Sequence, residues 1–597
     1  MRSSAYKFDK RAIRYYRHVK KLTGFIKRHL FLIVTTLAVW TFFANQMPLW
    51  NGYYESADGY MRALRVYHWL LAPSFAEHPI YESNYPFGEI LHWTRPMDII
   101  WILMTIPFRY LHELKDTIFI SGAFIAPCLG VITTVTLAYG LRRTFNLYLV
   151  LIGCILFLAN PLILSYFKSS VPDHHALMSL LSVYCFSLTL CWLKKRQNRY
   201  LRWLGLTLAL AVFTAIEGII LYTIFIGFFL YLYIFKNISL NHTVKITKYF
   251  ATGLTVFWFL NPPYEGWLYP DNGRLSILYV TAAWLAFVIF WGLEKSRLHT
   301  PKLKILSLWS MGLGFSLALA LLFTPKIFQF PITPDARLLF KRGCLEFISF
   351  PNASLETALA LWLYPLLSIL LSLYMIEKKA YHRLMTLNLY LGLPIFVLSL
   401  TAARFTNYVS LYTILPTLAW LDYLYKKSSY AKTKSGRFPE YIWTAVLCIL
   451  ILPSLCAAPY YISQQKQETQ PQITPMLCQK IKNTGGTLLT DMFLSPQYVW
   501  SCDVNTVATP YHRNIEGIRE TLKMLNTQTV GEAIPFILKH QITQILLFDN
   551  YNSSFYPLTE KNKNKLYYRL IKRQNVPPYL EEIPTTPASA RLYKIKI

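Results

Sequence analysis

Charged residues are scarce in this chain, and acids are the scarcer kind. Only 15% of the 597 residues are charged, and 30 acidic residues face 60 lysines and arginines. Soluble globular domains carry nearer a quarter charged residues. Hydrophobic residues make up 54% of the chain, and many apolar runs reach the 17–25 residues that cross a bilayer. The composition therefore predicts a multi-pass membrane protein.

The excess of positive charge does not predict nucleic-acid binding. Lysine and arginine collect in the short cytoplasmic loops of membrane proteins, which accounts for a net charge of +30. The nine cysteines include no CxxC pair and no zinc-type spacing. A cleavable signal peptide is not expected, because the first apolar run follows a basic head and is long enough to remain as a membrane helix.

The distribution of basic residues predicts a topology. Residues 1–28 hold ten lysines and arginines and one acid, which predicts a cytoplasmic head. We expect about 13 membrane helices between residues 29 and 458. Their ranges are 29–47, 115–140, 147–167, 175–193, 201–216, 219–235, 246–260, 275–293, 304–324, 356–376, 384–400, 407–425 and 440–458. The apolar stretch 99–112 is short for a span, so we expect it to be interfacial or re-entrant.

This register places every basic loop inside and four segments outside: the loops 48–114 and 325–355, the short "VPDHH" segment, and the tail 459–597. The tail differs from the rest because strand-like stretches ("GTLLTDMF", "ITQILLFD") alternate with helix-like ones ("IEGIRETLKMLN", "VGEAIPFILKH"). It is therefore expected to be a small α/β domain in the periplasm. Cys478 and Cys502 lie in it, either bonded in an oxidising compartment or as two free thiols.

Two outer segments carry residues that suit a metal ion. Asp58 follows the first span by about ten residues; it either caps the next helix or serves as a metal or substrate carboxylate. Asp173 and His175 in "VPDHH" are two positions apart, and a carboxylate and a neutral imidazole are ordinary ligands of divalent metals. The alternative is that Pro172 and Asp173 only begin a helix.

Other outer residues suit a sugar phosphate. His92, Trp93 and Arg95 in "NYPFGEILHWTRPMD" are either membrane-surface anchors or a flat face and a guanidinium for a sugar-phosphate head group. Arg404 lies at an outer membrane edge, where a basic residue favours a specific anionic partner. The role of Glu217 at an outer helix end stays open. The loop 331–356 is either a solvated linker or a lid.

Together these motifs resemble the catalytic subunits of oligosaccharyltransferases, which are GT-C membrane glycosyltransferases with thirteen spans and an outer C-terminal domain. The segment "YPFGEILHW" is similar to the family's first outer loop, and "DHH" to its Asp-x-(Asp/Glu/His) motif. The chain also resembles a group of uncharacterised bacterial inner-membrane proteins with "HW(T/S)R" and "ATPYHRN", here residues 508–514.

The resemblance implies roles for individual residues. Asp58 would be a catalytic and metal-binding acid, and Asp173 and His175 would be metal ligands, for Mg²⁺ or Mn²⁺. Glu346 would be the catalytic glutamate of the later outer loop, with Glu356 as the rival, and Arg404 would contact phosphate or acceptor. The tail lacks the WWDYG signature that reads an Asn-x-Ser/Thr acceptor.

The function that follows is transfer of a sugar or oligosaccharide from a polyprenyl-phosphate-linked donor to a protein or lipid acceptor at the outer face of the inner membrane. Three alternatives remain at this point: a transporter or flippase for a lipid or anion, a GT-C enzyme that modifies lipid A or protein Ser/Thr, and a scaffold that has lost its activity.

Overall fold

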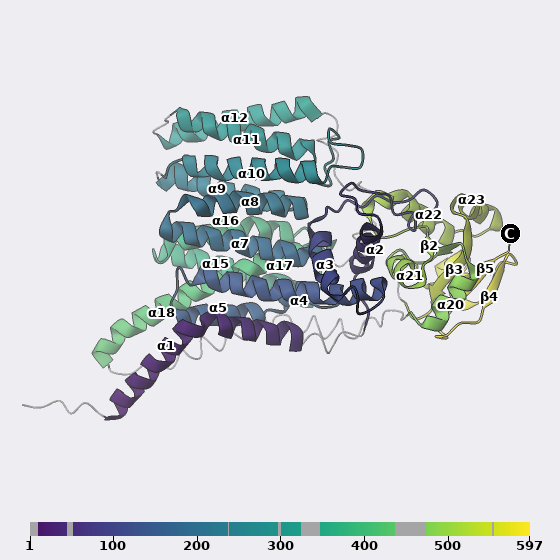
Figure 1. The fold of residues 1–597 in the computed structure, drawn as a ribbon, viewed down its shortest axis with the longest axis horizontal. Coiled ribbons are helices and arrows are strands. Elements are labelled where there is room, and N and C mark those ends of the chain that lie inside the picture. Colours follow the sequence, from purple (N-terminus) through teal and green to yellow (C-terminus); the bar gives the residue numbers. More distant parts are fainter. Residues whose placement is uncertain are drawn as a thin grey trace, which may run out of the picture.

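The computed structural model describes residues 10–44, 52–236, 238–296, 300–323, 347–435, 473–551 and 555–596. Its larger part is a bundle of long helices that lie side by side, and a small sheet domain sits at one end of the bundle (Figure 1). The helices of the bundle are α1 (Lys10–Val39), α4 (Leu114–Leu141), α5 (Leu147–Leu158), α6 (Pro161–Leu164), α7 (His174–Lys195), α8 (Asn198–Thr214), α9 (Gly218–Lys236), α10 (Asn241–Leu260), α11 (Ile277–Lys295), α12 (Pro301–Phe323), α15 (Tyr364–Glu377), α16 (His382–Ser399), α17 (Phe405–Tyr412) and α18 (Ile414–Ser435).

Seven of the described helices are long and apolar enough to cross a membrane. The pair α5 and α6 would make an eighth span, but it is bent by 63°. Asn160 explains the break, because its side chain accepts the N–H of Leu162 and begins a new helix at Pro161, which lacks an N–H of its own. The protein is therefore a polytopic membrane protein.

Helices occupy each predicted span from 29 to 425 as far as the structure describes them, whereas 440–458 lies outside the described residues. Two of these spans, 147–167 and 407–425, each divide into two helices. The total of thirteen spans stays a prediction. The stretch 99–112 is too short for a span, as expected: α3 (Pro96–Thr105) and the single 3₁₀ turn after it end at Phe108.

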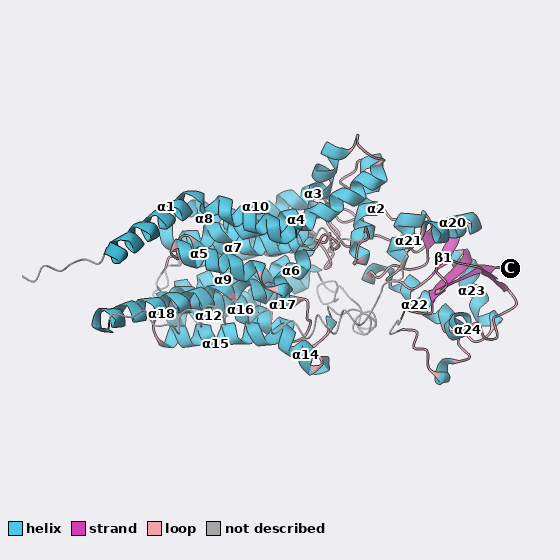
Figure 2. Cartoon of the chain, turned by 90° about the horizontal axis from the view of Figure 1, so that it is seen from below, coloured by secondary structure: helices cyan, strands magenta, loops and turns pink. Residues whose placement is uncertain are grey.

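The first outer loop lies between the bundle and the sheet domain. It contributes α2 (Ala57–Leu71) and α3, both of which Figure 2 places at that junction. Part of the loop pairs directly with the sheet domain, since Ser83 and Thr506 form a parallel β-bridge. The bundle, the loop and the domain thus meet at one place.

The tail is the expected α/β domain. Its five-stranded sheet has the order β2-β1-β3-β5-β4, in which β2, β1 and β3 are parallel and β5 runs antiparallel to both β3 and β4. The strands are β1 (Thr487–Leu489), β2 (Asn505–Thr506), β3 (Ile542–Phe548), β4 (Leu580–Ile583) and β5 (Ala590–Ile595). The helices are α20 (Pro475–Thr484), α21 (Ser495–Cys502), α22 (Ile515–Leu525), α23 (Val530–His540) and α24 (Leu566–Lys572).

A disulfide joins α20 to α21. It links Cys478 to Cys502, the two cysteines whose bonding the sequence left open, across 24 residues of chain. Both sulfur atoms lie in the core beneath the sheet, together with Leu488 and Leu546. The bond therefore fixes the two helices that lead into and out of β1.

Removing this disulfide should destabilise the sheet domain. A disulfide that closes a loop of this length raises the free energy of the unfolded chain by about 3 kcal/mol. The double variant Cys478→Ser with Cys502→Ser should therefore have a lower midpoint of thermal unfolding. Differential scanning calorimetry of the purified protein measures the change. Cys154→Ser, at a buried cysteine of the bundle, is the control. An equal midpoint in the double variant and wild type would contradict the structural role.

Candidate metal centre

A carboxylate and two imidazoles meet where α7 begins. Asp173 is the N-cap of α7, and its side chain accepts the backbone N–H of His174. The His174 Nδ1 atom lies 2.5 Å from Asp173 Oδ1, and the His175 Nε2 atom lies 3.7 Å from Asp173 Oδ2. One ligand atom from each residue falls within 4.8 Å of the others. Asp173 therefore begins a helix, as one interpretation had it, and also gathers the ligand atoms that the other requires.

His174 is a third candidate ligand, beyond the two that the sequence predicts. Residues two positions apart can point the same way, which predicts that Asp173 and His175 lie together. The N-cap geometry brings the ring of His174 to the carboxylate as well. The rings of His174 and His175 lie 4.3 Å apart at their centroids. All three residues belong to the cluster, whereas Asp58 does not.

The ring of His175 is held in place by its neighbours. Its Nδ1 atom is 2.7 Å from the hydroxyl of Tyr408 in α17, and the ring of Tyr166 stacks on it at 4.7 Å. A hydrogen bond at one ring nitrogen fixes the tautomer and orientation of the other, which is the usual support of a metal-binding histidine. The Nε2 atom, nearer Asp173, is the one left for a metal.

The residues present fit a divalent cation. The donor set is one buried carboxylate and two imidazoles, which suits such ions. Burial opposes ionisation of Asp173, but His174, His175 and Arg62 lower its pKa, so that the carboxylate form prevails at neutral pH. In addition the Nδ1 atom of the nearby His92 is buried without a hydrogen-bond partner. The carboxylate of Asp173 is thus in the form that metal binding needs, whereas the same carboxylate raises the pKa of His174, so that a metal would have to displace a proton from that ring.

Asp58 lies in the first turn of α2 but is not its cap. The N-cap is Ser56, whose side chain accepts the N–H of Gly59, so the capping interpretation of Asp58 is wrong. The Oδ1 atom of Asp58 accepts a hydrogen bond of 3.0 Å from the hydroxyl of Tyr511, in the sheet domain. Burial and the charge of Asp58 raise the pKa of Tyr511 well above its ordinary value, so the phenol stays protonated and donates.

The segment before α2 is fastened to the segment before α7. The N–H of Glu55 donates to the carbonyl of Ser170 at 2.9 Å, and Lys168 forms an ion pair of 3.4 Å with Glu55. Gly59 lets the two segments approach closely, since a Cβ atom there would come within 2.9 Å of the Tyr54 ring and 3.1 Å of Pro172. This clasp, residues 54–59 against 168–173, joins the segment that carries Asp58 to the segment that carries Asp173.

The expected sugar-phosphate residues line the same region. The ring of Trp93 has the guanidinium of Arg62 at 4.3 Å and the edge of Tyr511 at 4.9 Å. The ring of His92 is 4.4 Å from that of His512. Burial lowers the pKa of His92, and His512, Arg513 and His174 lower it further, so this imidazole is neutral.

Arg95 is engaged inside the protein. Its guanidinium lies 3.3 Å from Asp98 and 3.6 Å from Glu77, and stacks over Trp69 at 4.8 Å. It belongs to a buried network in which Arg62 and Arg65 also pair with Asp98, and Arg65 and Arg274 with Glu77. Since removing one partner of such a network leaves a buried charge uncompensated, the network fixes the geometry of the first outer loop.

Arg404 and Glu217 form an ion pair of 3.1 Å between the start of α17 and the start of α9. Burial opposes ionisation of Glu217, but Arg404 and, less strongly, His174 and His175 lower its pKa. Glu217, whose role the sequence left open, therefore lies within electrostatic reach of the two histidines. Of the two candidate glutamates, Glu356 lies exposed in α14 (Leu355–Ala358), and Glu346 lies outside the described residues.

The sheet domain contributes three residues that no role had been assigned to. Tyr511 reaches Asp58, His512 stacks near His92, and Arg513 forms an ion pair with Asp271, between α10 and α11. The sequence signal was the segment "ATPYHRN", in which hydroxyl, imidazole and guanidinium follow one another. Its place in the site depends on how the domain docks, which local sequence does not encode.

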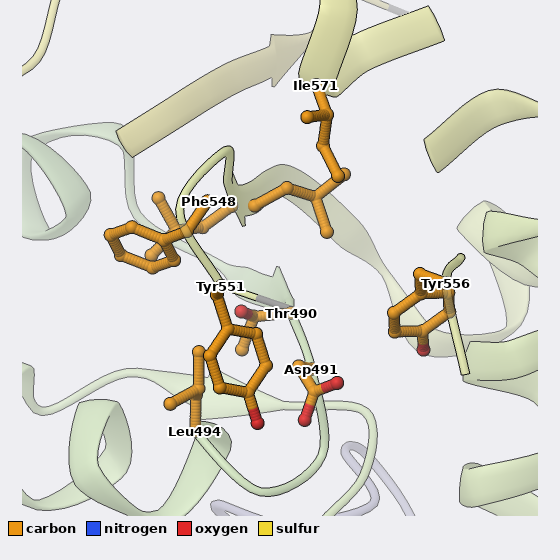
Figure 3. Close-up of a pocket in the computed structure, with 9 residues that line it drawn as sticks. Thr490, Asp491, Leu494, Phe548, Tyr551, Tyr556 and Ile571 are labelled. Atoms are coloured by element: carbon orange, nitrogen blue, oxygen red, sulfur yellow. The ribbon is translucent and has the colours of Figure 1, made fainter. Parts of the chain in front are cut away.

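Figure 3 shows a small cavity elsewhere in the sheet domain, where the parallel strands β1 and β3 end. Thr490, Asp491, Tyr551 and Tyr556 line it. The carboxylate of Asp491 accepts the N–H of Phe493 at 2.9 Å, so it serves the turn after β1. None of these residues belongs to the metal cluster.

Comparison with solved structures identifies the architecture. An oligosaccharyltransferase from Archaeoglobus fulgidus in the apo form has a similar structure, with a TM-score of 0.67 and 13% sequence identity. The alignment covers 94% of this chain and 80% of the archaeal chain. The archaeal oligosaccharyltransferase AglB from Archaeoglobus fulgidus, in complex with an inhibitory peptide and a dolichol-phosphate, matches with the same coverage and identity and a TM-score of 0.70. The chain has an oligosaccharyltransferase-like GT-C fold.

Two further structures of that archaeal enzyme are similar. One, tethered to an acceptor peptide with the NVT sequon, has a TM-score of 0.65 at 14% identity and covers 96% of this chain and 74% of its own. The other is a complex with Zn and sulfate, with a TM-score of 0.58 at 14% identity, covering 87% and 68%. No protein-family model and no curated protein sequence matches the chain.

A pH-dependent stability should arise where the first outer loop meets the sheet domain. Glu89 is buried there, bonded to the hydroxyls of Ser83 and Thr509, and burial raises its pKa from 4.5 to about 7. The folded protein therefore prefers the neutral carboxyl. Its contribution is complete below the unfolded pKa and is lost as pH rises through about 7.

The shift in the pKa of Glu89 corresponds to about 3 kcal/mol at most. Thermal unfolding between about pH 5 and pH 8 should show a fall in the midpoint that Glu89→Gln, which cannot ionise, lacks. A wild type and a Glu89→Gln variant with the same pH dependence would contradict the prediction.

The close approach of the clasp gives a second prediction. Gly59→Ala would ordinarily favour a helix, yet its methyl group collides with the buried ring of Tyr54 and presses on Pro172. We expect a loss of about 1–3 kcal/mol of stability, measured by thermal unfolding. Gly52→Ala adds a methyl group to open space, but at a positive φ of 78°, so Gly292→Ala in α11, with open space and no such φ, is the matched control.

Proposed function

We propose that this protein is a metal-dependent membrane glycosyltransferase, which transfers a sugar or oligosaccharide from a polyprenyl-phosphate-linked donor to an acceptor at the outer face of a bacterial inner membrane. The observation that carries the proposal is the Asp173–His174–His175 cluster, in a chain with an oligosaccharyltransferase-like fold. A transporter would more often place its ionisable residues in mid-membrane, in matched broken helices.

The metal would be held by Asp173, His174 and His175, with Asp58 as the acid from the first outer loop. When bound there, a divalent cation supplies a Lewis acid for the negative charge on the departing phosphate. Mg²⁺ or Mn²⁺ is the ion that the resemblance implies. The Zn complex of an archaeal enzyme with the same fold supports the choice of a divalent metal.

The chain's own residues would bind and orient the two substrates. Arg404 would add a charge-assisted contact to the phosphate, exchanging part of its pairing with Glu217 for the ligand. Trp93 and His92 would present flat faces to the sugar, and Arg95 would hold the loop that carries them. Asp58 or a glutamate of the later outer loop, Glu346 or Glu356, would orient or deprotonate the acceptor.

The donor is better supported than the acceptor. The dolichol-phosphate and the acceptor peptide of the archaeal structures support a lipid-linked donor and a peptide acceptor. The absence of WWDYG from the sequence argues against reading of an Asn-x-Ser/Thr site. A lipid acceptor or a protein hydroxyl is consistent with the same donor chemistry.

The orientation belongs to the proposal. The basic head 1–28 would lie in the cytoplasm, residues 29–458 would form the membrane domain, and the domain within 459–597 would lie in the periplasm. The disulfide between Cys478 and Cys502 supports that placement, because disulfides persist in oxidising compartments.

Substitution of the cluster tests the function. In a deletion strain complemented with Asp173→Ala or Asp58→Ala, transfer should fall by at least about 100-fold, because the leaving phosphate loses its charge stabilisation. Mass spectrometry of glycans and carrier lipids should then show the unmodified acceptor and an accumulated lipid-linked donor.

The control is Glu532→Ala, at an exposed acid of α23, and it is compared with Asp173→Ala and Glu356→Ala in protein that inserts and folds normally. A larger loss in Glu356→Ala would move the catalytic role to the later loop. Unchanged glycoconjugates in the Asp173→Ala strain would refute the enzymatic function, and altered lipid distribution without altered glycans would favour the transporter.

A further inference from the structure

The segment 506–513 of the sheet domain is laid in register against the first outer loop. The N–H of Thr506 donates to the carbonyl of Glu82 at 2.8 Å, and the N–H of Tyr85 donates to the carbonyl of Thr506 at 3.1 Å. The hydroxyls of Thr509 and Ser83 are 2.9 Å apart. These bonds fix where the residues that follow Thr509 must lie.

Tyr511 is the residue that this register brings to Asp58. Its side chain is 4% exposed and its ring meets Trp93 edge-on, so the ring has little freedom to move. The ring of Trp93 also carries the guanidinium of Arg62 over its face, and Arg62 pairs with Asp98 at 3.0 Å in the buried ion network. The packing of the ring against Trp93 thus holds the tyrosine hydroxyl at hydrogen-bond distance from Asp58 Oδ1.

The clasp joins the segment that carries Asp58 to the segment that carries Asp173. Gly59, the next residue, lies against Pro172, the residue before Asp173. A carboxylate at such a position can still rotate about its side-chain bonds, and a donor on one oxygen restricts that rotation. Such supporting hydrogen bonds commonly control metal affinity by 10–100-fold.

We propose that Tyr511 is a positioning residue, which orients the Asp58 carboxylate toward a cation held by Asp173, His174 and His175. The C-terminal domain therefore completes the metal centre of the membrane domain, in addition to any part it has in acceptor binding. This inference rests on the metal site of the proposed function.

Binding of Mn²⁺ alone to the purified full-length chain tests the inference without any sugar substrate. Isothermal titration calorimetry should give a dissociation constant 10–100-fold higher for Tyr511→Phe than for wild type. Tyr498→Phe is the matched control, because it removes a hydroxyl that is buried without a hydrogen-bond partner in the same domain. It should bind Mn²⁺ as wild type does.

A double-mutant cycle separates orientation from general damage. Asp58→Asn should weaken Mn²⁺ binding, and adding Tyr511→Phe should weaken it no further, because the tyrosine acts only through Asp58. Full additivity of the two losses would overturn the proposal, as would wild-type binding in Tyr511→Phe. If Tyr511→Phe does not fold, wild-type Mn²⁺ binding in Asp58→Asn overturns the proposal, because the tyrosine would then have no metal-binding carboxylate to orient.

Asp173→Ala distinguishes failure of this inference from failure of the function beneath it. If Asp173→Ala binds Mn²⁺ as wild type does, the metal site itself is wrong. If Asp173→Ala abolishes binding while Tyr511→Phe leaves it unchanged, only the positioning role of Tyr511 is wrong.

Discussion

The clasp between residues 54–59 and 168–173 is the constraint on which the candidate site depends. One backbone hydrogen bond, from Glu55 to Ser170, and one close contact, of Gly59 with Pro172, join two segments that are more than a hundred residues apart in the chain. Each segment ends in a helix start, and each helix start carries an acid. Because the clasp lies directly before both helices, it sets the distance between Asp58 and the cluster at Asp173.

A network of buried charges is built on Asp98 and Glu77 of the first outer loop, where burying a charge costs free energy. Four arginines pair with Asp98 and Glu77, and the network is enclosed by Trp69 and Trp93. An unpaired charge there would cost several kcal/mol. The network therefore resists rearrangement, and the loop that carries His92 and Trp93 keeps one shape.

The sheet domain closes the third side of the site. Its contacts with the first outer loop combine backbone pairing at Thr506 with side-chain bonds at Thr509, and the next residues reach Asp58, His92 and Asp271. In an oligosaccharyltransferase-like fold without WWDYG, this domain still contributes residues to the candidate site. Its docking links the stability of the sheet domain to the geometry of the candidate site.

The sequence by itself determined the parts of this protein that depend on short-range pattern. Apolar length predicts the helices, because lipid requires every backbone group to be paired within its own segment. Alternation predicts the strands of the tail, and the composition of "VPDHH" predicts metal ligands at a helix start. The sequence shows that the tail holds two cysteines, but it does not show whether they form a disulfide.

Tertiary structure alone decided which distant residues meet. His174 joined Asp173 because of the N-cap geometry, Glu217 came to face the histidines through its pairing with Arg404, and Tyr511 reached Asp58 across a domain junction. Ser56, two residues before Asp58, took the capping role. Such contacts are set by the packing of whole elements against one another, and the energy that selects them is spread over many side chains, so no local pattern records them.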